Sequence, residues 1–234
     1  MTNLMIRQPG YMPNIGFFKK IQSSHTFVFY DDAQFVKDGF DNRNKIRTSE
    51  GYRWITVPVK RPVFSKKLNE IEISYDTNWR KQHCDLIFEC YSKTKYFSSY
   101  WNSIKKILDK KYEKLINLNL DLIKFINSEL KIPTQTILSS ELNISETKTR
   151  KLVLICSKLN ATCYISGING REYLEEDLFK KSKIKLIYEN FLHPEYNQFH
   201  GNFIENMSII DLLFNMGEKS IRILENIKNF EINE

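Results

Sequence analysis

The order of elements at the start of the chain limits its fold most. Residues 4–8 form a short apolar run that ends in a Pro-Gly turn, residues 15–22 have one apolar side, and residues 26–30 are rich in strand-forming residues. A strand, a helix and a second strand in this order favour parallel pairing through a right-handed crossover. The sequence therefore predicts an α/β protein built on a mostly parallel, Rossmann-like sheet.

The rest of the chain adds strands and helices that alternate at both ends around a helical block. Apolar spacing predicts helices over residues 78–93, 100–111, 115–130, 146–159 and 208–216, with a trailing helix at 221–227. It predicts strands over 43–47, 52–59, 161–166 and 184–189, and a half-exposed strand over 71–75. We expect a single α/β domain over 1–234, with a helical insertion at 76–131.

Composition and charge limit the function classes. The hydrophobic share of 41% excludes a disordered chain. No apolar run approaches the roughly 20 residues of a membrane-spanning helix, and the N-terminus has no apolar leader. We therefore expect a cytoplasmic protein without membrane insertion. The net charge of +7 favours anionic partners without choosing among them. The four cysteines have no metal-binding spacing, so we expect buried thiols and no metal site.

The turn after the first predicted strand is the first candidate site. Two prolines and two glycines restrict residues 8–16, and a helix begins within the turn. In open α/β sheets ligands bind at this edge, and a helix N-terminus favours an anion. Gln8 and Tyr11 would contact such a ligand. The alternative is an ordinary rigid turn.

Two further polar groups follow the predicted strands. Asp31, Asp32 and Gln34 end the second strand, where they could hold a sugar hydroxyl, a metal or a substrate amine; the alternative is that they only form a turn. Asn42, Arg43 and Lys45 offer hydrogen bonds and a guanidinium fork that suits phosphate. This second group could also be a solvated charge run.

Three places could supply catalytic groups. His83 lies on an apolar helical stripe, where it is either a core residue or a base. His193 begins a loop that also carries Tyr196 and Gln198. Ser166 and Gly167 end a predicted strand, where a ligand could approach the backbone closely. The chain has no phosphate-binding P-loop and no dinucleotide-binding glycine fingerprint, which argues against a standard NTPase, kinase or NAD enzyme.

Taken together, these motifs resemble the WbqC-like protein family. The matching stretches, in order, are QPGYMP at 8–13, DDAQF at 31–35, NRNKI at 42–46, WITVPV at 54–59, WRKQH at 79–83, SEL at 140–142, YISG at 164–167, HPEYNQ at 193–198 and SIIDLLFN at 208–215. The resemblance covers roughly residues 6–217. Asn14 departs from it, because the family favours tryptophan there.

The resemblance implies a context in bacterial surface-polysaccharide (O-antigen) gene clusters and supplies no established catalytic residue. Such clusters need enzymes that modify nucleotide-linked amino sugars. The first loop and the strand–helix order also resemble the nucleotide-binding half of pantothenate synthetase-type nucleotidyltransferases, which implies a fold more than a function.

We therefore expect a transferase that attaches an acyl or aminoacyl group to the amine of a nucleotide-linked deoxyamino sugar. His193 or His83 would be the base, and Arg43 and Lys45 would hold the diphosphate. Asp31, Asp32 and Gln34 would orient the sugar. Ser166 with Gly167 would stabilise an oxyanion. The donor would be a CoA ester, a carrier-protein thioester or an aminoacyl-tRNA. The alternatives are an ATP-dependent adenylating or nucleotidyl-transferring enzyme, and a non-catalytic protein that binds a glycan-assembly partner or RNA.

Overall fold

Strand β1 (Asn3–Arg7) is the centre of the sheet and pairs in parallel with a strand on each side. Its five residues alternate between the two faces: Leu4 packs with one buried cluster and Met5 with the other. A strand buried on both faces suits a parallel sheet covered by helices. The computed structural model describes residues 2–227.

Five parallel strands form the sheet, in the order β5-β2-β1-β6-β7. The strands besides β1 are β2 (Thr26–Phe29), β5 (Gln135–Leu138), β6 (Cys163–Gly167) and β7 (Lys185–Glu189). The chain proceeds outward to one edge through β1, β2 and β5, then returns to the other side of β1 as β6 and β7. The order therefore reverses between β1 and β6. The α/β, Rossmann-like, mostly parallel fold expected from the sequence is confirmed.

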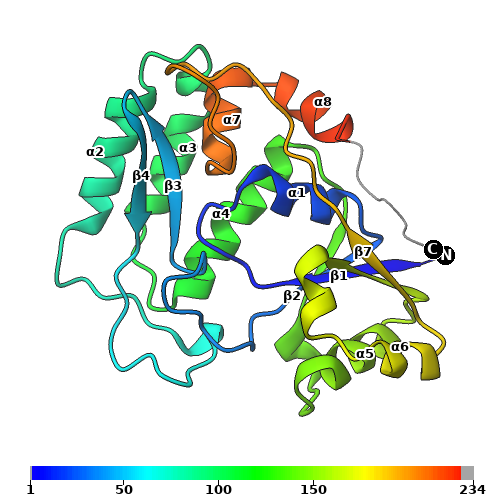
Figure 1. Ribbon diagram of the computed structural model, residues 1–234. Coiled ribbons are helices and arrows are strands. Elements are labelled where there is room, and N and C mark those ends of the chain that lie inside the picture. The colour runs from blue at the N-terminus through cyan, green and yellow to red at the C-terminus, as the bar shows by residue number, and fades with distance from the viewer. Residues whose placement is uncertain (1, 228–234) are drawn as a thin grey trace.

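Helices cover both faces of the sheet (Figure 1). On one face, α5 (Lys148–Lys158) and α6 (Glu176–Lys181) pack over Leu4, Val28 and Tyr164. On the other face lie α1 (Ile15–Gln22), α4 (Leu115–Glu129), α7 (Ile209–Met216) and α8 (Lys219–Glu225), in the cluster that includes Met5 and Phe27.

A long connection between β2 and β5 holds the remaining elements. It contains the antiparallel hairpin of β3 (Arg43–Thr48) and β4 (Gly51–Thr56), then α2 (Trp79–Tyr91), α3 (Phe97–Asp109) and α4. The predicted insertion at 76–131 covers these helices. Their apolar sides join the same buried cluster as the sheet face with Met5. The single-domain organisation stays a prediction.

One predicted strand is wrong, and one observed strand has no counterpart in the prediction. Residues 71–75 form no strand: Glu72 and Ile73 each make an isolated bridge, to Lys114 and Val59 respectively, so their alternating pattern has no continuous partner. Strand β5 was not predicted. It has only four residues, the first two of which are exposed, so its sequence has no apolar run to reveal it.

Candidate functional site

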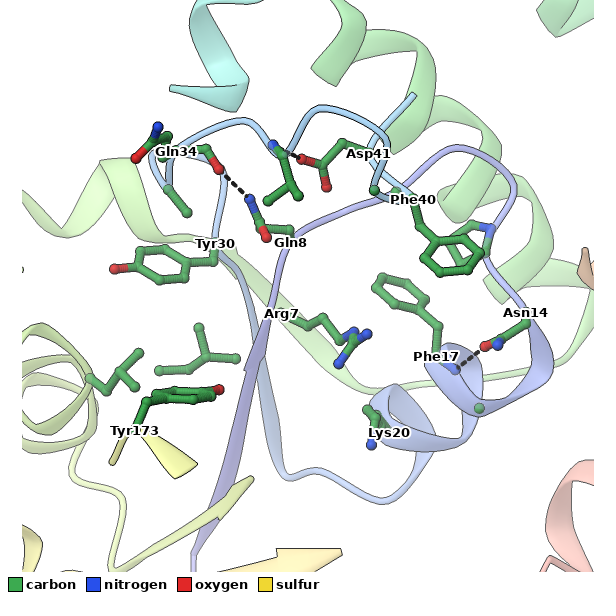
Figure 2. A pocket seen from close by; sticks show the side chains of 18 of the residues that line it. Arg7, Gln8, Asn14, Phe17, Lys20, Tyr30, Gln34, Phe40, Asp41 and Tyr173 are labelled. Carbon is green, nitrogen blue, oxygen red and sulfur yellow. Dashed lines mark hydrogen bonds between the residues drawn. The ribbon is translucent and has the colours of Figure 1, made fainter. Parts of the chain in front are cut away.

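A cavity of about 850 Å³ opens at the carboxyl ends of β1 and β2, beside the point where the strand order reverses. The turn after β1, the segment after β2 and the start of α5 form its walls. In open α/β sheets this crevice is where ligands bind. Figure 2 shows its side chains, among them Arg7, Gln8, Asn14, Phe17, Lys20, Tyr30, Gln34, Phe40, Asp41 and Tyr173.

The turn after β1 directs the N-terminus of α1 at this cavity. Asn14 caps the helix, since its side-chain oxygen accepts the Phe17 N–H at 3.3 Å, and both residues line the cavity. A Cβ at Gly10 would lie 2.6 Å from the Phe40 carbonyl oxygen, so only glycine lets the turn pack against residue 40. The capped helix places a partial positive charge beside the cavity.

Two cations occupy the same side of the cavity. Figure 2 shows Arg7 extending from the end of β1 toward α1, which carries Lys20. Lys20 forms an ion pair with the buried carboxylate of Glu189, at the end of β7. Burial lowers the pKa of Lys20, and Glu189 opposes this effect. The guanidinium of Arg7 has no hydrogen bond or ion pair among residues 2–227, so it is available to an anionic ligand.

Asp41 places a titratable carboxyl on the opposite wall. Its Oδ2 accepts the Val36 N–H at 2.9 Å, and its backbone carbonyl accepts a hydrogen bond from buried Asn119 at 2.8 Å. Burial raises the pKa of Asp41 to about 6, although the Val36 hydrogen bond and the charge of Arg7 oppose the shift. A carboxyl with this pKa is half ionised near pH 6 and mostly ionised at neutrality, which suits general-base chemistry.

Aromatic rings form the remaining walls. Tyr30 and Tyr173 line one end, on the far side of β1 from Phe17 in the view of Figure 2. Phe17, Phe40 and Phe191 line the other end, and Gly16 leaves room for the Phe191 ring, which would lie 3.2 Å from a Cβ at that position. The cavity therefore combines apolar surface with a few convergent polar groups, as ligand sites do.

Of the residues predicted from the sequence, Gln8 and Gln34 line this cavity. Gln8 Nε2 donates to the Gln34 carbonyl at 2.9 Å, which joins the turn after β1 to the segment after β2. Asp31 instead accepts hydrogen bonds from Ser139 and Ser140, at the 3₁₀ helix Ser139–Leu142.

The neighbouring Asp32 forms a buried ion pair with Lys151 on α5. Together, Asp31 and Asp32 connect β2 to the segments after β5, and neither lines the cavity.

Both histidine candidates lie outside the set of cavity-lining residues. His83 is buried between Trp79 and Tyr11, and its Nδ1 lies 3.0 Å from the Tyr11 hydroxyl. Burial lowers the pKa of His83 to about 4, so it is neutral at physiological pH. His193 packs among aromatic rings, with Nδ1 2.9 Å from the Pro194 carbonyl oxygen; burial lowers its pKa as well.

The side chains of Tyr196 and Gln198 converge on Asp211 at the start of α7. The Tyr196 hydroxyl and Gln198 Nε2 donate to Asp211 Oδ2 at 2.8 and 2.9 Å. Burial raises the pKa of Asp211. This buried network fixes the loop that carries His193 against α7.

The other predicted residues lie at separate places. Ser166 is buried at the end of β6, where its hydroxyl contacts the Gly167 carbonyl at 3.2 Å. Asn42 and Arg43 line a second cavity of about 760 Å³ beside the β3–β4 hairpin. Lys45 lies on β3, with Nζ 4.8 Å from the centre of the Tyr52 ring on β4.

Sequence reasoning missed Arg7, Lys20, Asp41 and Tyr173. Arg7 and Asp41 directly precede Gln8 and Asn42, so the motif boundaries were one residue too narrow at both places. Lys20 lies one helical turn beyond Gly16, where the loop after β1 has ended, and it lines the same side of the cavity as Arg7. Tyr173 had no signal, because nothing local shows that a loop after β6 reaches the cavity.

No group of three or more His, Cys, Asp or Glu side chains within residues 2–227 is arranged to hold a metal ion. In the same range, the helices lack the length and apolar character needed to cross a membrane.

The fold and this cavity define a Rossmann-like protein with an anion-favouring crevice at its switch point. The chain belongs to the WbqC-like protein family, whose model matches residues 8–223. It is also 34% identical over 223 residues to a Mycobacterium tuberculosis protein described as "Uncharacterized protein Rv1507c", a match that covers 94% of this chain and 96% of the relative. No solved structure matches the chain.

Proposed function

We propose that the protein transfers an acyl or aminoacyl group to the amine of a nucleotide-linked deoxyamino sugar in surface-polysaccharide synthesis. The observation that carries the proposal is an exposed guanidinium and a carboxyl of pKa about 6 in one cavity at the switch point, those of Arg7 and Asp41. A diphosphate needs the first group and an amine nucleophile needs the second. Membership of the WbqC-like family supports the polysaccharide context.

The lining suggests how such a substrate would bind. The nucleoside would pack against Tyr30 and Tyr173, since an aromatic base stacks well on a ring. The diphosphate would lie near Arg7, Lys20 and the N-terminus of α1, where a helix favours an anion. The amino sugar would then face Asp41. The roles expected for Arg43 and Lys45 would pass to Arg7 and Lys20, because the latter pair lines this cavity.

In the reaction the sugar amine attacks the acyl carbonyl carbon of the donor. A C–N bond forms, the bond from the carbonyl carbon to the leaving oxygen or sulfur breaks, and the amine proton passes to the leaving group. The Asp41 carboxylate would accept the proton and return it. The geometry favours Asp41 over His193 and His83 as this base, since it alone of the three lines the cavity. A nucleotide-sugar substrate also supports a cytoplasmic location.

Thermal-shift measurements with a panel of ligands test the substrate class. A ligand at 100 times its Kd stabilises a protein by about 2.7 kcal/mol. We expect a shift with a UDP- or TDP-linked amino sugar and none with ATP. The variant Arg7→Gln should lose most of the shift, whereas the control Arg53→Gln, which also changes an exposed arginine but lies on β4, should keep it.

Two results would contradict this proposal. A shift with ATP alone would favour the adenylating alternative. An unchanged shift in Arg7→Gln would place the nucleotide outside this cavity.

A further inference from the structure

Almost all of the net positive charge comes from one segment. Residues 35–67 contain nine Lys and Arg against three Asp and Glu, a balance of +6 out of the +7 of the whole chain. This segment includes the β3–β4 hairpin, which lies apart from the five-stranded sheet (Figure 1). Arg47 is buried and Lys60 is paired with Glu72 outside the segment, which leaves an excess of +4. A local excess of this size favours a polyanion as partner.

A row of exposed aromatic rings lies in the same segment. Tyr52 and Trp54 occupy the same face of β4 and are 48% and 40% exposed, and Phe40 beside them is 50% exposed. The ring centres of Tyr52 and Trp54 are 6.5 Å apart, and those of Trp54 and Phe40 are 5.7 Å apart. Three neighbouring rings left open to solvent are costly unless a partner covers them.

Cations lie over these rings. Lys45, directly opposite Trp54 in the hairpin, has Nζ 4.8 Å from the Tyr52 ring centre and 5.8 Å from that of Trp54. The guanidinium of Arg43 lies 4.5 Å from the Trp54 ring centre. We call these five residues, Phe40, Arg43, Lys45, Tyr52 and Trp54, the hairpin face. Rings interleaved with cations are what proteins use to stack successive bases and neutralise the phosphates of a single strand.

The hairpin face leads to the catalytic cavity. Phe40 belongs to both, because its ring contacts Trp54 and also lines the cavity beside Gly39 and Asp41. On the other side of the same loop, Arg43 lines the second cavity with Lys37. A strand that stacks along the face toward Phe40 would therefore bring its end to the mouth of the cavity.

We propose that the hairpin face binds the single-stranded 3′ end of an RNA, and that this RNA carries the acyl group that the enzyme transfers. The claim that the RNA carries the acyl group rests on the proposed function, whereas the claim that the hairpin face binds RNA does not. An acidic protein would complement the same positive charge, but it would not explain the row of three exposed aromatic rings. Duplex RNA gives none either, since its bases are already stacked.

With this donor the transfer is balanced. The sugar amine attacks the ester carbonyl at the terminal ribose, the amide C–N bond forms and the ester C–O bond breaks. The amine proton ends on the ribose oxygen, which leaves as a free hydroxyl. No oxidant, reductant or further co-reactant is needed.

The test is fluorescence anisotropy with a labelled acceptor-stem RNA that has a single-stranded 3′ overhang, compared with the same stem made blunt. We expect the overhang to bind more tightly, with a salt slope of about −2 if three phosphates are contacted. Trp54→Ala should weaken binding roughly tenfold, while Trp54→Phe retains a ring and most of the affinity. As a control, Lys181→Gln removes an exposed positive charge on α6, outside the hairpin, and should change nothing.

Several results would overturn the proposal: equal affinity for the overhang and the blunt stem, an unchanged Kd in folded Trp54→Ala and Tyr52→Ala, or binding of an acidic acyl carrier protein without any binding of the RNA. The nucleotide-sugar shift is measured separately, without RNA. RNA binding without that shift would contradict the proposed function alone, and the shift without RNA binding would contradict only the RNA donor.

Discussion

Asp41 links the stability of the protein to its proposed chemistry. Its pKa is raised from 3.8 to about 6 in the folded protein. Between these values the folded state keeps a proton that the unfolded chain has lost. The stability that this proton contributes is therefore fully present below about pH 4 and is lost as the pH rises through 6. Above that pH the folded protein holds an ionised carboxylate in a buried position, and this is the form that the proposed reaction needs.

The substitution Asp41→Asn should therefore stabilise the protein and inactivate it. The Asn side-chain oxygen can still accept the Val36 N–H but cannot ionise. We expect a gain of about 2 kcal/mol in the free energy of unfolding at pH 8 that disappears near pH 4. We also expect kcat to fall by roughly 10² to 10⁴. Urea unfolding at several pH values measures the first effect, and a stability difference that does not change with pH would contradict the assignment.

At the scale of single elements, α1 has the most direct influence on the cavity. The Asn14→Ala substitution removes the cap and should cost about 1 kcal/mol of stability. It should also weaken nucleotide-sugar binding, because the first turn of the helix lines the cavity. Asn14→Ser supplies another capping oxygen and should restore most of both quantities. Chemical unfolding and thermal shift measure them; an Asn14→Ser variant as weak as Asn14→Ala would show that capping is not the cause.

A helix or strand can be predicted from the sequence when the residues of that element themselves carry the apolar spacing and are bounded by turn residues. The β1–α1–β2 order, α2 and the β3–β4 hairpin are predictable because apolar spacing and turn residues are local. Strand β5 is not, since only its pairing with β2 makes it a strand. The same limit applies to the site. Gln8 could be placed from the strand that precedes it, whereas the separation of Asp31 from the cavity depends on Ser139 and Ser140, far along the chain.

At the scale of the whole molecule, one loop lies between the two proposed binding sites. Residues 36–43 form a wall of the cavity at the strand ends through Phe40 and Asp41, and a wall of the second cavity through Lys37 and Arg43. The ends of β1 and β2 and the N-terminus of α1 line the cavity proposed for the nucleotide. The long connection between β2 and β5 supplies most of the positive charge. The two substrates would thus meet at a boundary between the parallel sheet and the antiparallel hairpin.

Because Phe40 belongs to both surfaces, we expect binding at one to strengthen binding at the other. A saturating nucleotide sugar should lower the RNA Kd about fivefold, and by linkage saturating RNA should lower the nucleotide-sugar Kd by the same factor. The Phe40→Ala substitution should bring this factor close to one. Tyr52→Ala is the matched control: it removes a ring that contacts Trp54 but does not line the cavity, so it should weaken RNA binding and leave the factor unchanged. Titrations with and without the second ligand give both factors. An undiminished factor in Phe40→Ala would mean that the two sites communicate through another part of the loop, such as the Val36–Asp41 hydrogen bond.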